Sequence, residues 1–201
     1  MTGSMNLKTL SSLVRTTLVA TTMLACTTLA LAQAAPKVKF ATSSGDFVVE
    51  VYPDKAPKTV ENFLQYVKDK HYDGTVFHRV IGNFMVQGGG FDASFQQKPT
   101  RAPVVHEGRQ AMEKGLRNVV GTLAMARTND PQSATAQFFI NVKDNAFLDP
   151  GTQGFGYTVF GKVVSGMDVI DKIKTVPTGV GPVGADVPKT PILINSATLV
   201  K

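Results

Sequence analysis

The chain has 201 residues, of which 43% are apolar and 18% charged; this length predicts one domain, and this balance excludes a disordered or fibrous protein. Its formal charge of +6 comes from scattered lysines and arginines rather than from a basic stripe interleaved with aromatic residues, which argues against nucleic-acid binding. Eighteen glycines and eleven prolines indicate many turns and favour β structure over a helical bundle.

Residues 1–34 have the pattern of a secretory signal peptide, which predicts export. Lys8 and Arg15 come first without any acidic residue, and an apolar run over residues 18–32 follows. Small residues over 30–34 close this run as an A-x-A-like cleavage site. We therefore expect a mature domain of residues 35–201, free of the signal peptide.

Two alternatives remain for the first 34 residues. A transmembrane anchor needs roughly 20 apolar residues. The run here is shorter and interrupted by threonines, so stable membrane insertion is not expected. The second alternative is a lipoprotein, with Cys26 in the lipid-attachment sequence Met23-Leu24-Ala25-Cys26. Against it, the apolar run continues past Cys26, and a better cleavage site follows. Cys26 is the only cysteine, so a chain cleaved at that later site has no thiol.

A β-hairpin and a helix are predicted at the start of the mature domain. Val38–Ala41 and Asp46–Tyr52 are β-rich runs joined by the turn sequence Ser43-Ser44-Gly45. A helix is predicted over residues 57–68, where a proline suits the first turn and apolar residues recur at helical spacing. These apolar residues are Val60, Phe63, Leu64 and Val67.

Short apolar runs separated by glycine and proline follow, and they predict further strands. The runs are Val76–Ile81, Phe84–Gln87, Gly121–Met125, Gln137–Val142, Tyr157–Val163 and Ile192–Leu199. A second helix is predicted over residues 167–173, whereas residues 92–115 lack periodicity and are expected to form an irregular, exposed loop. Many short strands with two helices favour an antiparallel barrel or sandwich.

The segment over residues 77–90 carries the most informative chemistry. It contains one permanent cation, Arg79, one amide, Gln87, and large apolar side chains, but no carboxylate pair and no nucleophile. The three histidines of the chain lack the spacing of zinc ligands, and no Gly-Lys-Ser/Thr follows the glycine run at 88–90 as in a phosphate-binding loop. We therefore expect neither a metal nor another cofactor.

Six motifs occur in the order and spacing of one protein family. They are Phe-His-Arg-Val-Ile at 77–81, Phe-Met-Val-Gln-Gly-Gly at 84–89, Ala-Met-Ala at 124–126, Gln-Phe-Phe-Ile at 137–140, Phe-Leu-Asp at 147–149 and Val-Phe-Gly-Lys-Val at 159–163. From about Val38 to its end, the chain resembles the cyclophilin-type peptidyl-prolyl cis-trans isomerases. Ala-Met-Ala-Arg-Thr at 124–128 is most similar to the secreted cyclophilins of Gram-negative bacteria.

The resemblance implies a fold and a site. The fold is mainly β, a closed eight-stranded antiparallel barrel capped by two α-helices. The implied catalytic residues are Arg79, Phe84, Gln87 and Phe139, with Gln87 bonded to the substrate backbone. Phe84, Met85, Phe139 and Leu148 form the implied proline pocket. The other implied groove residues are Ala126, Arg127, Gln137, Phe147 and Tyr157.

The same resemblance implies the partners and the location. The expected substrates are proline-containing polypeptides, unfolded or partly folded exported proteins, and the enzyme is expected to act as a monomer in the periplasm.

Many eukaryotic relatives have Trp at the Phe147 position and His at the Tyr157 position, and the indole N–H is a donor that cyclosporin uses. The resemblance therefore does not imply that this protein is sensitive to cyclosporin. Many relatives also have Pro-Gly where this chain has Gly82-Asn83, which still makes a turn.

The residue types suit isomerisation on physical grounds as well. Rotation about a peptide bond has a barrier of roughly 18–20 kcal/mol, and catalysis requires only that the twisted amide bind better than either planar form. A guanidinium remains protonated and can stabilise the twisted amide, while an apolar floor holds the ring. A non-catalytic proline-peptide binder would not need Arg79. A lipocalin-like carrier would need an interior lined for a ligand. His78 is expected on the strand face opposite to Arg79.

Overall fold

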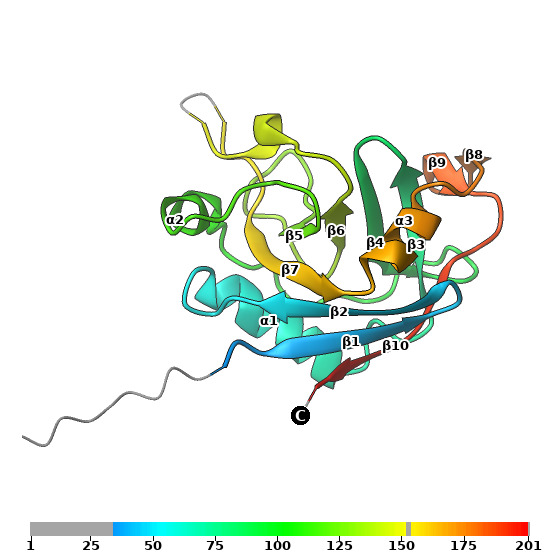
Figure 1. The fold of residues 1–201 in the computed structure, drawn as a ribbon, viewed down its shortest axis with the longest axis horizontal. Helices are drawn as coiled ribbons and strands as arrows, with labels where there is room; N and C mark the ends of the chain where they lie inside the picture. Colours follow the sequence, from blue (N-terminus) through cyan, green and yellow to red (C-terminus); the bar gives the residue numbers. More distant parts are fainter. Residues whose placement is uncertain (1–33, 152–153, 201) are drawn as a thin grey trace, which may run out of the picture. The chain divides into compact units, whose positions relative to one another are not determined.

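The computed structural model describes residues 34–151 and 154–200, and they form a closed antiparallel barrel of eight strands (Figure 1). The strands neighbour one another in the order β1-β10-β3-β4-β6-β5-β7-β2. Their bounds are β1 Lys37–Thr42, β2 Gly45–Val51, β3 Thr75–Ile81, β4 Met85–Asp92, β5 Thr122–Met125, β6 Phe138–Asn141, β7 Val159–Ser165 and β10 Leu193–Leu199. The predicted barrel is confirmed. The expected signal peptide and Cys26 lie outside the described residues.

Aromatic side chains fill the inside of the barrel. Phe40 and Phe47 of the first hairpin stack with ring centroids 5.0 Å apart, and Phe40 also lies 5.5 Å from Phe138 of β6. Phe63, from helix α1 (Pro57–Lys68), contacts Phe138 and, at 5.1 Å, Phe160 of β7. All five rings are at most 1% exposed, so side chains occupy the interior that a lipocalin-like carrier would keep for its ligand.

The N-terminus of α1 is capped by a residue distant in the sequence. Ala56, which precedes the helix, has no side chain that could accept a hydrogen bond. The buried carboxylate of Glu107 accepts instead, from the backbone N–H of Lys58 at 3.1 Å and from the N–H and hydroxyl of Thr59 at 2.8 and 2.7 Å. An anion at this position satisfies donors that have no partner within the helix and complements the helix dipole.

Helix α3 (Met167–Ile173) has the predicted bounds, as α1 does, but two other elements differ from expectation. The expectation of an irregular loop over 92–115 is wrong at α2 (Gly108–Glu113), a short helix that follows the capping Glu107. A ribbon of β8 (Thr178–Gly181) and β9 (Gly184–Pro188), which was not predicted, lies outside the barrel and packs on β3.

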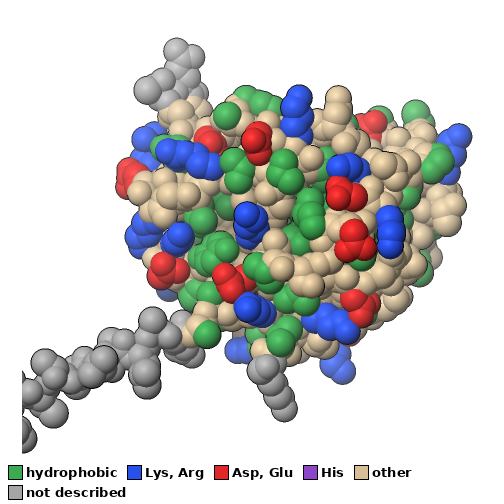
Figure 2. Space-filling view, in the orientation of Figure 1, with side chains coloured by type: hydrophobic (Ala, Val, Ile, Leu, Met, Phe, Trp, Pro, Cys, Tyr) green, Lys and Arg blue, Asp and Glu red, His purple; other side chains and the backbone are tan. Residues whose placement is uncertain are grey.

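The face in Figure 2 shows acidic and basic side chains interspersed, without a large patch of one sign. This agrees with the scattered bases of the sequence. None of the helices in the described residues is long and apolar enough to cross a membrane.

Candidate active site

Strands β4, β6 and β5 pair side by side and place residues from distant parts of the sequence around one pocket of about 130 Å³. Gln87 of β4 pairs with Phe139 of β6, which in turn pairs with Ala124 of β5. Neighbouring residues of a strand point to opposite faces, so Phe138 lies in the aromatic core while Phe139 lines the pocket. The lining residues are Arg79, Phe84, Met85, Gln87, Ala126, Arg127, Phe139, Leu148 and Tyr157. All of them are among the site residues that the family resemblance implies.

The apolar part of this pocket is formed by closely packed side chains. Met85, Phe139 and Leu148 are buried, and the edge of the Phe139 ring meets Tyr157 at 5.5 Å between centroids. Leu148 belongs to η1 (Ala146–Leu148), a single 3-10 turn, and its carbonyl accepts the N–H of Tyr157. These contacts form a floor that fits an apolar ring.

Arg79 stands at the rim of the pocket, on β3 opposite Gln87. Its side chain is 43% exposed, and its Nε lies 3.9 Å from Oδ2 of Asp186 on β9. Asp186 has a left-handed backbone (φ 63°), which is uncommon for a residue other than glycine. Among the described residues, no hydrogen-bond partner engages the terminal guanidinium nitrogens of Arg79, so they can meet a substrate.

Gln87 of β4 and Gln137, which immediately precedes β6, extend the site beyond the apolar floor. Gln87 Nε2 donates to Gln137 Oε1 at 3.0 Å. The Gln137 side chain packs directly over Gly90, where any Cβ would overlap it. The glycine run at 88–90 therefore lies within β4 and permits close packing, and the sequence-based exclusion of a phosphate loop agrees with this position.

A second, polar pocket of about 290 Å³ adjoins the first and shares Gln87, Ala126 and Arg127 with it. Its other lining residues are Gln97, Thr100, Thr128, Ser133, Thr135 and Gln137. Sequence analysis predicted only Gln137 of these six. The others lie in loops without periodicity, and the only available signal was the run of small polar residues that follows Arg127.

Arg127 forms the wall between the two pockets. Its Nε and Nη2 donate to the carbonyl of Gly156 at 3.1 and 2.8 Å, and its Nη1 donates to the carbonyl of Thr128. Its guanidinium lies over the Tyr157 ring, 4.6 Å from the centroid. Because these bonds engage all three of its guanidinium nitrogens, Arg127 contributes a fixed, charged surface, unlike Arg79.

Phe147 is the one predicted site residue that lines neither pocket. Its side chain is 74% exposed and stacks on Phe84, with centroids 5.6 Å apart and an interplanar angle of 25°. The Phe147 ring thus lies beside the entrance of the smaller pocket, where a bound substrate could contact it.

The three histidines lie outside the smaller pocket, and their environments oppose protonation. His78 is buried with its ring edge against Phe91, and burial lowers its pKa to about 4. Burial also lowers the pKa of His71 and of His106. The prediction that His78 points away from the groove is confirmed, since it lines neither pocket. Within the described residues, no group of three His, Cys, Asp or Glu side chains is arranged to hold a metal ion.

Comparisons with known proteins match this fold and its motifs. Residues 37–199 match the family model described as cyclophilin type peptidyl-prolyl cis-trans isomerase/CLD. The chain is 56% identical over 165 residues to a peptidyl-prolyl cis-trans isomerase of Streptomyces antibioticus, covering 81% of this chain and 97% of that protein. It is 53% identical over 165 residues to peptidyl-prolyl cis-trans isomerase B of Escherichia coli, covering 81% and 98%.

Solved structures show the same fold. A cyclophilin type peptidyl-prolyl cis-trans isomerase of Cryptosporidium parvum matches with a TM-score of 0.65 at 22% identity, covering 83% of this chain and 98% of that one. The structure of the same protein in the presence of the dipeptide ala-pro matches with a TM-score of 0.64 at 23% identity, covering 82% and 99%.

Proposed function

Because the chain belongs to the cyclophilin-type family and is a peptidyl-prolyl cis-trans isomerase, we propose that the pocket beside Arg79 is its active site and that exported proteins are its substrates. The assignment of the pocket as the active site rests on one observation. A single guanidinium with available donors stands at the rim of a buried apolar floor made of Met85, Phe139 and Leu148. Exported proteins as substrates rest on the signal-peptide pattern of residues 1–34.

In the proposed reaction, the prolyl ring rests on the apolar floor while the preceding carbonyl rotates. Twisting the amide removes its resonance and leaves a lone pair on the proline nitrogen. Arg79 donates a hydrogen bond to that lone pair or to the adjacent carbonyl, and this bond is strongest when the amide is twisted. Stabilising the twisted amide more than either planar form raises the rate of isomerisation. Gln87, held by Gln137, bonds the substrate backbone and limits how the peptide lies. No bond is broken, and no proton is transferred.

The neighbouring polar pocket extends the site to the residues that flank proline. It is walled by Arg127 and lined by the amides and hydroxyls of the loops that follow β4 and β5. A proline peptide bound on the floor would run past this pocket, since both share Gln87 and Ala126. Residues of one chain supply a guanidinium, an apolar floor and a backbone-binding amide, so the proposed site does not require a second subunit, and we propose that the enzyme acts as a monomer.

The specificity constant is expected to be nearly constant from about pH 6 to 8.5. The proposed mechanism transfers no proton, and the amide of Gln87 has no ionisable group. His78 has a pKa of about 4 because it is buried, so it is neutral throughout. The check is kcat/KM for an X-Pro peptide across this range. A tenfold step near pH 6.5 that disappears in His78→Gln would make the histidine a participant and contradict the mechanism.

Unlike kcat/KM, the free energy of unfolding is expected to depend on pH. The pKa of His78 is lower in the folded state than its ordinary value of 6.5, so the unfolded chain binds more protons between about pH 4 and 6.5. The free energy of unfolding therefore falls as the pH is lowered through this window, and replacing His78 with glutamine should reduce that slope.

Export is tested by the N-terminus of the protein recovered from the cell that produces it. Mass spectrometry should show a start near Gln33 or Ala35 and no lipid, in a fraction released when only the outer envelope is opened. A diacylated Cys26 at the N-terminus would establish the lipoprotein alternative. An intact Met1 or Met5 in the cytoplasmic fraction would contradict export.

A further inference from the structure

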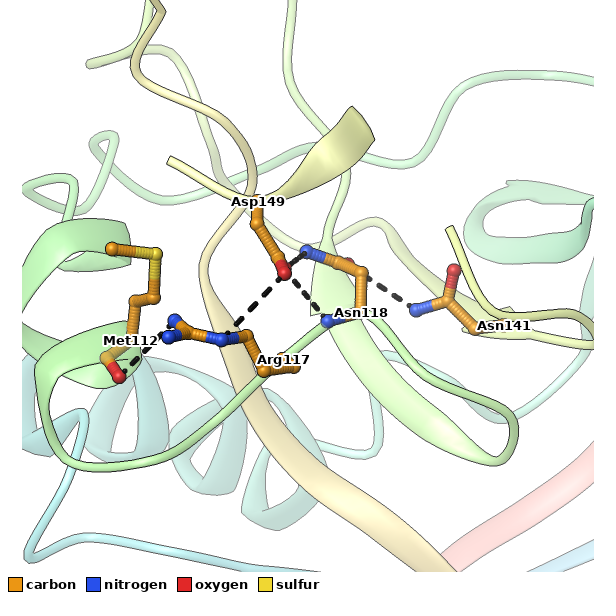
Figure 3. Close-up of polar contacts among 5 residues, drawn as sticks. All are labelled: Met112, Arg117, Asn118, Asn141 and Asp149. Atoms are coloured by element: carbon orange, nitrogen blue, oxygen red, sulfur yellow. Dashed lines mark hydrogen bonds and ion pairs between the residues drawn. The ribbon is translucent and has the colours of Figure 1, made fainter. Parts of the chain in front are cut away.

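A row of buried side-chain amides, two of which are drawn in Figure 3, connects Asp149 with residues that line the proposed active site. Asn118, Asn141 and Asn145 are each at most 2% exposed. They come from three segments: the loop before β5, the end of β6 and the loop before η1. Figure 3 shows Asn141 pointing toward Asn118, and Asn118 pointing toward Asp149, which follows η1.

The hydrogen bonds along this row all run in one direction. Asn145 Nδ2 donates to Asn141 Oδ1 at 2.7 Å, and Asn141 Nδ2 donates to Asn118 Oδ1 at 3.2 Å. The backbone N–H and Nδ2 of Asn118 then donate to Asp149 Oδ1 at 2.8 and 2.9 Å. An ionised carboxylate can only accept, so Asp149 fixes the orientation of each amide in turn. Such a chain is polarised along its length and ends in charge-assisted bonds.

The other end of the row reaches the pocket through Asn145. Its Nδ2 also donates to the carbonyl of Phe84 at 2.9 Å, and its backbone carbonyl accepts the N–H of Leu148 at 2.8 Å. Phe84 lies in the turn between β3 and β4, where its N–H donates to the carbonyl of Ile81 and its carbonyl also accepts the N–H of Val142. Leu148 lies in η1, outside the barrel strands. Both line the pocket. Asn145 therefore joins two parts of the pocket wall.

The stability of the fold alone does not require amide side chains at these positions. Well-packed apolar residues of similar volume often stabilise a core as well as a buried polar network does, whereas a polar network admits only the geometry in which every bond is made. We propose that Asn118, Asn141 and Asn145 are positioning residues that hold Phe84 and Leu148 at the separation that fits a five-membered prolyl ring. This inference rests on the proposed function of the pocket.

The test compares two peptides that differ only in ring size, one with proline and one with the six-membered pipecolic acid. One methylene in a fitted apolar pocket changes kcat/KM by about tenfold or more, and the wild-type protein should favour proline by that order. Asn118→Ala leaves the contacting groups of Phe84 and Leu148 in place but interrupts the row. It should lower kcat/KM for the proline peptide about tenfold and for the pipecolic peptide much less, so that the ratio approaches unity.

A stability-matched variant separates positioning from general destabilisation. Ile194→Ala leaves a cavity in β10, which contributes no residue to either pocket. It should lower the melting temperature and leave the ratio of the two kcat/KM values unchanged. If Asn118→Ala does not fold, Asp149→Asn replaces it, because the shape is kept and only the charge at the end of the row is lost. That variant should lower the ratio about twofold to threefold.

The outcomes distinguish this inference from the function on which it rests. A folded Asn118→Ala or Asp149→Asn protein with the wild-type ratio overturns the positioning role and leaves the isomerase assignment intact. A wild-type protein that accelerates both peptides equally also overturns it, since the pocket would then not select the ring. A wild-type protein that accelerates neither peptide overturns the proposed function itself.

Discussion

Arg79→Ala is expected to lower kcat/KM for an X-Pro peptide by roughly two to three decades, a loss of about 3–4 kcal/mol of transition-state stabilisation. The Arg79 side chain is partly exposed beside the pocket, and its ion pair with Asp186 is long and also partly exposed. Removal of the side chain should therefore leave the fold unaffected. The protease-coupled assay, with circular dichroism as a check on folding, measures both effects.

Two matched variants sharpen this prediction. Arg79→Lys keeps the charge but loses the planar fork, so it should recover only part of the loss. Arg109→Ala removes an arginine of α2 that lines neither pocket, and its kcat/KM should equal that of the wild type. A folded Arg79→Ala protein that isomerises the peptide at the wild-type rate would refute the assigned mechanism.

Glu107→Ala is expected to have the largest effect on stability. The carboxylate accepts three hydrogen bonds at the start of α1, and alanine leaves the Lys58 and Thr59 N–H groups without an acceptor. A hydrogen bond to a charged group is worth about 1.5–3 kcal/mol, but the alanine variant also avoids the cost of burying a carboxylate. We therefore expect a net loss of about 3 kcal/mol in the free energy of unfolding. For a domain of this size that is a fall in melting temperature of roughly 10 °C.

The controls for Glu107 are an isosteric and a positional variant. Glu107→Gln keeps one acceptor oxygen and should lose about half as much stability. Glu113→Ala removes an exposed carboxylate at the other end of α2 and should change the free energy of unfolding by less than about 0.5 kcal/mol. Equal stabilities for Glu107→Ala and Glu113→Ala would mean that the cap contributes nothing to α1.

The elements that the sequence predicted well are those that local pattern determines. Helix α1 has the predicted bounds because a proline suits its first turn and its apolar residues repeat at helical spacing. The first hairpin and α3 follow from local pattern in the same way. The β8–β9 ribbon was missed because residues 177–184 are rich in glycine and proline and do not alternate. Its place is set by packing against β3.

The candidate site was predicted in part for a related reason. Eight of the nine residues of the smaller pocket lie in motifs of the family, and the ninth, Tyr157, lies two residues before one, so the resemblance identified all of them. Gln97 and Thr100 were missed because they come from a loop without any pattern. The contacts of Asp186 with Arg79, and of Glu107 with α1, join distant segments, and only the folded chain brings them together.

The most direct test of the central claim is the cis-to-trans rate of an X-Pro peptide as a function of protein concentration. The uncatalysed exchange takes tens to hundreds of seconds, so acceleration is easily resolved. The rate is expected to rise in proportion to the concentration of wild-type protein and to remain close to the uncatalysed value at the same concentrations of Arg79→Ala. A rate that does not change with wild-type concentration would contradict the assignment of this chain as an isomerase.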